Sequence, residues 1–172
     1  MSDMTLEKAI QTAIEYETKV RDTYADAVEK ATEDVGKKIF QALCDEEQGH
    51  LDYLTARFDE WERTGTVKAA ELTTQLPDQA GIAKGVAKLE KKVTEYDWGM
   101  ELSLLKNALL LESETGQFYK NMVAELDDTG KQLFTRFMEI EEAHYDMVQA
   151  QIDALTGMGY WYDFMEFDLE AG

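Results

Sequence analysis

The chain has two histidines, and each lies three residues after a glutamate. The two pairs are Glu47 with His50 and Glu141 with His144. On a helix, residues three apart project from the same face, so each pair can hold one metal ion. A single pair of this kind is usually a surface contact in so acidic a chain, and it does not establish a metal site alone.

Two further glutamates, Glu17 and Glu112, interrupt stripes of apolar residues that recur at helical spacing. The two Glu-x-x-His pairs interrupt two other such stripes in the same way. Four carboxylates buried in one core cost free energy unless something compensates their charge. Two divalent cations balance four carboxylates, and two neutral imidazoles complete the ligands. The sequence therefore predicts a two-metal site formed by Glu17, Glu47, His50, Glu112, Glu141 and His144.

The predicted ligands are carboxylates and imidazoles, without a thiolate. Such ligands favour iron or manganese over copper or structural zinc. We expect two iron ions per chain because sites of this kind support redox chemistry with oxygen species. Manganese is the alternative, and zinc is expected only as an adventitious substitute. The single cysteine, Cys44, excludes an internal disulfide and a cysteine-based zinc or rubredoxin-type iron centre, and it is expected to be a buried thiol.

Tyr24 and Tyr119 each lie seven residues after a lone glutamate, which is two helical turns further along the same face. In one interpretation their hydroxyls take part in the site, as hydrogen-bond donors to its ligands or as an electron relay beside the metals. In the other they are core aromatics whose hydroxyls find some partner. The spacing alone does not separate these two interpretations.

Four amphipathic segments are predicted to be helices, at residues 5–32, 37–63, 99–126 and 131–155. Gly36, Gly65 and the run Asp127, Asp128 and Gly130 are expected to break them. The connection 64–98 contains the only proline, Pro77, and a lysine-rich piece near residues 84–93 that is expected to be helical. Short links predict two antiparallel hairpins, and the long link is expected to start the second hairpin in the same direction as the first.

The two hairpins resemble each other. The spacing from Glu17 to Tyr24 equals that from Glu112 to Tyr119. A longer set also matches with identical internal spacing: Gly36, Lys37, Phe40, Glu47, His50 and Asp52 correspond to Gly130, Lys131, Phe134, Glu141, His144 and Asp146. A duplicated hairpin packs around a pseudo-twofold axis, which brings matching groups together in the middle. We therefore expect one all-α domain over residues 1–172, with hairpins at 5–63 and 99–155 and a tail at 156–172.

The amino-acid composition of the chain limits the kinds of molecule that it is expected to bind. The chain has 36 acidic and 17 basic residues, a formal charge of −19 that repels nucleic acid and anionic membranes. Its start lacks the pattern of a signal peptide, and no apolar run reaches the ~18 residues that span a bilayer, so a soluble cytoplasmic protein is expected. The basic stretch 84–92 is either a docking patch for an acidic redox partner or, as we favour, the exposed face of a connecting helix. The stretch 159–164, which is rich in aromatic residues, is expected to fold back over the bundle or to form a dimer contact.

Segments 17–24, 45–54, 108–119 and 139–144 together resemble the rubrerythrin branch of the ferritin-like superfamily. The resemblance implies a ferritin-like four-helix bundle with a di-iron centre on the six residues named above, in a homodimer or a higher homo-oligomer. It also implies reduction of hydrogen peroxide, whereas other members of the superfamily oxidise ferrous iron and store it.

The sequence departs from that family in two ways. Full-length rubrerythrins carry a rubredoxin domain with four cysteine ligands, which this sequence lacks, so electrons are expected from an external donor protein. Rubrerythrins also tend to have another glutamate one turn after the ligand of the third helix, and Thr115 stands there instead. Three functions follow as hypotheses: a peroxide- or oxygen-reducing oxidoreductase, a ferroxidase or iron-storage protein, and a bundle in which metal only stabilises the fold.

Overall fold

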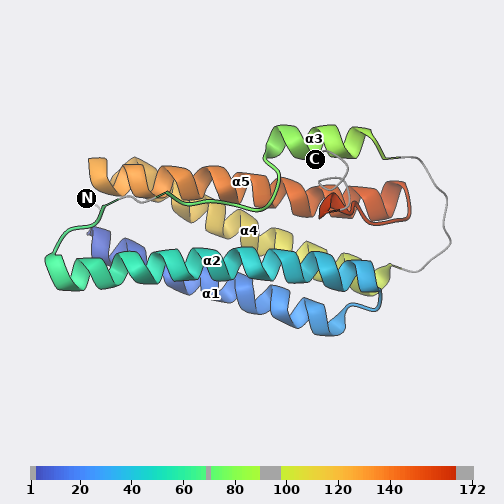
Figure 1. Ribbon diagram of the computed structural model, residues 1–172, viewed down its shortest axis with the longest axis horizontal. Helices are drawn as coiled ribbons and strands as arrows, with labels where there is room; N and C mark the ends of the chain where they lie inside the picture. Colours follow the sequence, from blue (N-terminus) through green and yellow to red (C-terminus); the bar gives the residue numbers. More distant parts are fainter. Residues whose placement is uncertain (1–2, 69–70, 90–97, 166–172) are drawn as a thin grey trace.

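The structure is a computed structural model that describes residues 3–68, 71–89 and 98–165. These residues form α1 (Leu6–Lys30), α2 (Asp34–Thr64), α3 (Gln79–Ala87), α4 (Gly99–Glu125) and α5 (Asp128–Gly157). The four long helices make a bundle, in which α1 packs on α2, α4 packs on α5 and α1 also contacts α4 (Figure 1). The short α3 lies outside the bundle against α5. The predicted all-α, ferritin-like bundle is confirmed.

Local sequence signals set several helix ends. The Thr5 side chain accepts a hydrogen bond from the Lys8 amide at the start of α1, and the Asp127 side chain accepts one from the Gly130 amide at the start of α5. Gly65 ends α2 in the left-handed conformation with φ of 71°. The break predicted at Gly65 is therefore correct.

The breaks predicted at Gly36 and Gly130 are wrong, because both residues lie in the first turn of a helix. A glycine is needed at each of these two positions because another side chain packs closely against its backbone. A Cβ on Gly36 would lie 2.6 Å from the Trp161 ring, and a Cβ on Gly130 would lie 2.7 Å from Leu126. Close packing, rather than a chain break, explains these two glycines.

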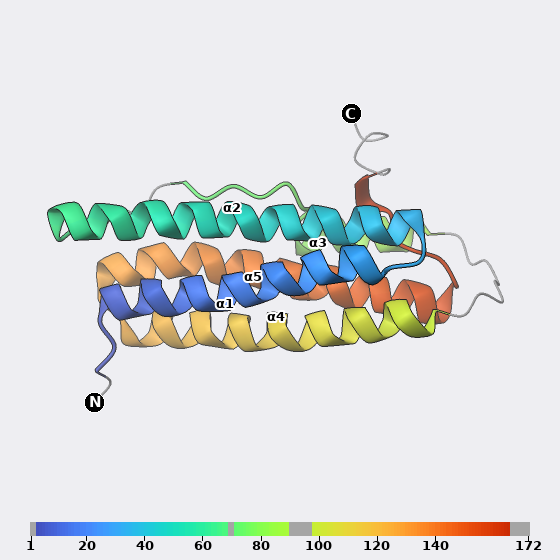
Figure 2. The same cartoon turned by 90° about the horizontal axis from the view of Figure 1, so that it is seen from below.

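The direction predicted for the second hairpin is also wrong. After α2, the chain runs back along the bundle past α3 and begins α4 at the end where α1 finishes (Figure 2). Consequently α4 is antiparallel to α1 and parallel to α2. Two hydrogen bonds require the same arrangement, since Tyr24 on α1 meets Glu112 whereas Tyr119 on α4 meets Glu17. A link that spans the bundle reverses the second hairpin relative to the first.

The core has two apolar clusters, one toward each end of the bundle. One is centred on residues such as Phe40, Leu43 and Leu105, and the other on residues such as Leu54, Phe134 and Phe137. Ionisable side chains of the four long helices are buried between them. The two clusters hold the helices on both sides of these polar groups.

The tail folds back onto the bundle, which was the first of its two predicted alternatives. Trp161, Tyr162 and Phe164 are buried in the cluster that contains Phe40. The backbone of Tyr162 is held by Gln151 of α5, whose side chain donates to its carbonyl at 2.7 Å and accepts from its amide at 3.0 Å. Residues 166–172 lie outside the described residues, as does part of the basic stretch 84–92, of which α3 covers residues as far as Ala87.

Cys44 is only partly buried, in contrast to the buried thiol that was expected. Burial and the neighbouring Asp45 raise its pKa, which disfavours the reactive thiolate. None of the helices in the described part of the chain is both long enough and apolar enough to cross a membrane.

Candidate metal centre

All six predicted ligands are buried at the middle of the bundle, each with at most 1% of its surface exposed. Glu17 comes from α1 and Glu112 from α4, while each Glu-x-x-His pair lies on α2 or α5. Ligand atoms of Glu47, His50, Glu141 and His144 lie within 4.8 Å of one another, and this group could hold a metal ion. The structure therefore brings the sequence-predicted residues together.

The Glu-x-x-His pairs interlock across the two hairpins. Oε1 of Glu47 lies 2.9 Å from Nδ1 of His144, and Oε1 of Glu141 lies 3.4 Å from Nδ1 of His50. The two imidazoles are nearly parallel, with ring centroids 5.2 Å apart and an interplanar angle of 8°. The glutamate of each pair thus lies against the histidine of the other hairpin, so the two pairs form one cluster.

The lone glutamates stand beside the histidine of their own hairpin. Oε2 of Glu17 lies 3.3 Å from Nδ1 of His50, and Oε1 of Glu112 lies 3.9 Å from Nδ1 of His144. Nδ1 of both imidazoles therefore faces carboxylates from both hairpins. This convergence of one nitrogen and several oxygens on each side suits a divalent cation that prefers oxygen and imidazole ligands.

The two tyrosines hold the lone glutamates from the opposite hairpin. The Tyr24 hydroxyl donates to Oε1 of Glu112 at 2.5 Å, and the Tyr119 hydroxyl donates to Oε1 of Glu17 at 2.5 Å. Both rings are fully buried. Burial, followed by the adjacent carboxylates, raises the pKa of both phenols well above 10.0. Both hydroxyls are thus kept protonated as donors to ligand carboxylates.

The charges of the cluster compensate one another only in part. Burial alone would raise the pKa of Glu17, but the charge of His50 and hydrogen bonds from neighbours lower it to about 2. Burial and nearby carboxylates raise the pKa of Glu47 and Glu141 well above 4.5. Burial would lower the pKa of His50, yet Glu17 and Glu47 raise it well above 6.5. Burial thus disfavours ionisation of Glu47 and Glu141, whereas His50 offsets it at Glu17.

Several buried polar atoms of the cluster have no hydrogen-bond partner among the described residues. They are Oε2 of Glu47, Nε2 of His50, Oε2 of Glu112, both carboxylate oxygens of Glu141 and Nε2 of His144. A buried polar atom without a partner costs about 1–3 kcal/mol. Such a concentration of unpaired oxygens and nitrogens indicates a site for a ligand, and this set of carboxylates and imidazoles fits a metal ion of the iron or manganese type.

The rubrerythrin family model matches residues 1–57 of the chain. The first hairpin is rubrerythrin-like. The match contains α1 and most of α2, and hence Glu17, Glu47 and His50, and it confirms the resemblance inferred from the sequence. A search of curated proteins and a search of solved structures each found no match. The second hairpin lies outside this match. It is related to the first hairpin by the repeated spacing of its residues and by the matching positions of their side chains.

Sequence reasoning missed Glu46, which is buried next to the rubrerythrin-like pair. Its Oε2 accepts from the Thr74 hydroxyl at 2.7 Å, its Oε1 accepts from the Gln75 amide at 2.5 Å, and Oε2 lies 3.6 Å from Nε2 of His144. These partners outweigh the effect of burial and lower its pKa to about 2. The only sequence signal was a second carboxylate preceding Glu47. The equivalent position in the second hairpin is Ile140, so only one histidine has such a neighbour.

Thr115 lies where rubrerythrins tend to have a further glutamate. It is fully buried, and its hydroxyl donates to the Leu111 carbonyl at 2.8 Å, so it does not point a donor into the cluster. Thr115 therefore does not supply the side-chain ligand that a glutamate at this position would supply. The centre has four glutamates and two histidines that converge, with a neutral side chain at the additional position.

Proposed function

We propose that this protein is a di-iron oxidoreductase that reduces hydrogen peroxide or oxygen with electrons from a separate donor protein. The observation that carries the proposal is the convergence of six buried side chains, five of which have an oxygen or nitrogen without a hydrogen-bond partner among the described residues. The match of the first hairpin to rubrerythrins supports the same chemistry. A homodimer or a larger homo-oligomer is part of this proposal.

Four glutamates and two histidines would hold two iron ions, and their charges balance: four negative carboxylates against two divalent cations. When bound, the iron ions supply the two electrons that, with two protons, convert hydrogen peroxide into two molecules of water, and the donor protein restores those electrons. The tyrosine hydroxyls fix the lone glutamates, and Glu46 orients His144. The ring of Phe137 packs nearly perpendicular to the His50 ring, with the two centroids 5.6 Å apart.

A second candidate function is the oxidation of ferrous iron for storage or delivery. Two observations support it. Thr115 replaces the extra glutamate expected of rubrerythrins, and the charge of −19 attracts cations to the surface. In the third hypothesis the metal only stabilises the bundle, and oxidant chemistry at the centre would then be absent.

Stopped-flow absorbance on anaerobically iron-loaded protein separates these functions. Hydrogen peroxide and oxygen are mixed in turn with the loaded protein. Fast oxidation by peroxide at two irons per chain, with oxygen slow, supports the peroxidase. Fast oxidation by oxygen that continues well beyond two irons per chain supports iron storage, and slow reaction with both oxidants supports a structural metal. Failure to bind iron at this stoichiometry would overturn the proposed centre itself.

A further inference from the structure

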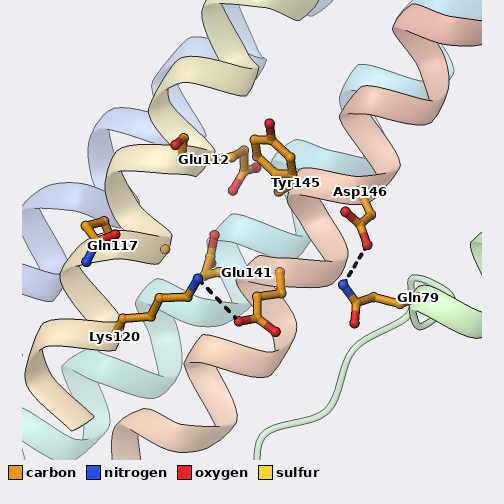
Figure 3. Close-up of a pocket in the computed structure, with 10 residues that line it drawn as sticks. Gln79, Glu112, Gln117, Lys120, Glu141, Tyr145 and Asp146 are labelled. Atoms are coloured by element: carbon orange, nitrogen blue, oxygen red, sulfur yellow. Dashed lines mark hydrogen bonds and ion pairs between the residues drawn. The ribbon is translucent and has the colours of Figure 1, made fainter. Parts of the chain in front are cut away.

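A cavity of about 340 Å³ opens between α4 and α5 beside the candidate metal centre (Figure 3). From α4 it is lined by Glu112, Gly116 and Lys120, and from α5 by Glu141 and Asp146 among others. Its volume exceeds that of several water molecules, each of which takes about 30 Å³ in the liquid. A small hydrated species can therefore occupy the space between these two helices.

The inner end of the cavity consists of two ligands of the proposed centre. Glu112 and Glu141 both line it, although each side chain is 1% exposed or less. Oε2 of Glu112 and both carboxylate oxygens of Glu141 have no hydrogen-bond partner in the described part of the chain. The cavity thus ends on buried oxygens that are available to bind a cation.

The outer part of the cavity is polar and mostly acidic. Nζ of Lys120 lies 3.7 Å from Oε1 of Glu142, and this ion pair joins α4 to α5. On the other side, Gln79 of α3 donates to Oδ2 of Asp146 at 2.6 Å. At the outer part, the two carboxylates of Glu142 and Asp146 outnumber the one lysine. A lining with this sign attracts cations and repels anions.

The two hairpins differ in the side chain that stands at the position of this opening. By the spacing from the lone glutamates, Gly116 of α4 corresponds to Arg21 of α1. The Arg21 guanidinium reaches from α1 to α2 and donates to the Gln48 side chain at 3.0 Å. At Gly116 an added Cβ would meet no atom within 4 Å. A large side chain bridges the first hairpin where the second has free space.

We propose that the cavity between α4 and α5 is the route by which divalent metal ions reach the centre from solvent. The proposal rests on the proposed function, since it takes the buried glutamates and histidines as a metal site. The acidic lining draws the hydrated ion inward, and the unpaired oxygens of Glu112 and Glu141 receive it. The ions loaded in the proposed function would be Fe²⁺.

The test is the rate at which Co²⁺, a spectroscopic probe of oxygen and imidazole ligands, loads the metal-free protein in a stopped-flow instrument. The variant Gly116→Leu fills the opening without adding a charge. It should slow loading at least about tenfold, equivalent to a barrier about 1.4 kcal/mol higher, and leave the final stoichiometry at two ions per chain. Gly49→Leu is the matched control, because Gly49 is an exposed glycine within α2 with equally open space, and it should load at the wild-type rate.

A second variant tests the charge of the route. Asp146→Asn preserves shape and should slow loading several-fold at low salt, with the difference disappearing at high salt because ions screen exposed charges. Loading of both Gly116→Leu and Asp146→Asn at the wild-type rate would overturn the route while leaving the metal centre intact. If Gly116→Leu does not fold, the salt-dependent defect of Asp146→Asn decides the matter. Absence of Co²⁺ binding by the wild-type protein at equilibrium would instead overturn the proposed function.

Discussion

The hydroxyl of Tyr119 on α4 donates a 2.5 Å hydrogen bond to Glu17 on α1, so each hairpin positions a carboxylate of the other. Tyr24 and Glu112 repeat this relationship in the opposite sense. The bonds cross the interface between hairpins at the depth of the histidines. They tie the geometry of the centre to the packing of the bundle.

Removing either tyrosine hydroxyl should destabilise the metal-free protein. Tyr119→Phe leaves the buried Glu17 carboxylate with one donor fewer, and Tyr24→Phe does the same to Glu112, at a cost of about 1–3 kcal/mol each. Urea unfolding at neutral pH measures this change. Tyr16→Phe is the control, since Tyr16 stacks on Phe118 at 4.9 Å and should change stability little. Equal stability of all three variants would show that the two hydroxyls do not support the carboxylates.

Replacing Glu141 by leucine should separate stability from metal binding. Glu141→Leu removes a buried ionisable group with two unpaired oxygens and should stabilise the metal-free bundle by about 1 kcal/mol or more. The same variant should lose most of the stabilisation that Fe²⁺ or Mn²⁺ gives the wild-type protein in thermal melts. Glu139→Leu, on the exposed side of α5, should retain that stabilisation. A metal-induced rise in Tm that survives in Glu141→Leu would argue against Glu141 as a ligand.

Glu46 should link the crossover segment, which is the connection at residues 64–98, to the candidate metal centre. In Glu46→Ala the Thr74 hydroxyl and the Gln75 amide lose their acceptor and His144 loses its neighbour, so unfolding free energy should fall by about 1–3 kcal/mol. Metal affinity, measured by calorimetry, should fall about 10–100-fold, as it does when the partner of a ligating histidine is removed. Glu62→Ala, at an exposed position of α2, provides the control. Unchanged affinity in Glu46→Ala would limit its role to anchoring the crossover.

Stability of the metal-free protein should decrease as the pH rises from about 5 to about 8. The pKa values of Glu47 and Glu141 are raised above 4.5 and that of His50 above 6.5. Across this interval the folded state therefore holds protons that the unfolded state releases, and stability present at low pH is lost as the pH rises through the folded pKa values. Glu17 and Glu46, with pKa values of about 2, act in the opposite sense but only below about pH 4.5.

Metal ions should reverse this trend, because they replace the same protons. The stabilisation given by a fixed concentration of Mn²⁺ should therefore grow with pH and be accompanied by proton release. Thermal melts at several pH values, with and without the metal, measure both effects. A metal-free stability that rises steadily over the interval would show that the buried carboxylates are ionised without a cation.

The sequence by itself determined the helical architecture and the members of the candidate centre. Helical periodicity depends on local side-chain chemistry, so the four long helices were found to within a few residues. The two histidines and their glutamates interrupt apolar stripes, and a stripe faces the core wherever the helices pack. For that reason Glu17, Glu47, His50, Glu112, Glu141 and His144 could all be named before their positions in space were known.

Only the tertiary structure decided how these elements face one another. Local spacing does not encode the direction of α4, which depends on where a long connection ends, and an antiparallel α1 and α4 are what place Tyr119 on Glu17. Glu46 likewise acquires its role only because residues 64–98 supply Thr74 and Gln75 as its partners. The opening beside Gly116 depends on the absence of a side chain between two helices. Contacts between distant segments determine such features, and periodicity along one segment carries no information about them.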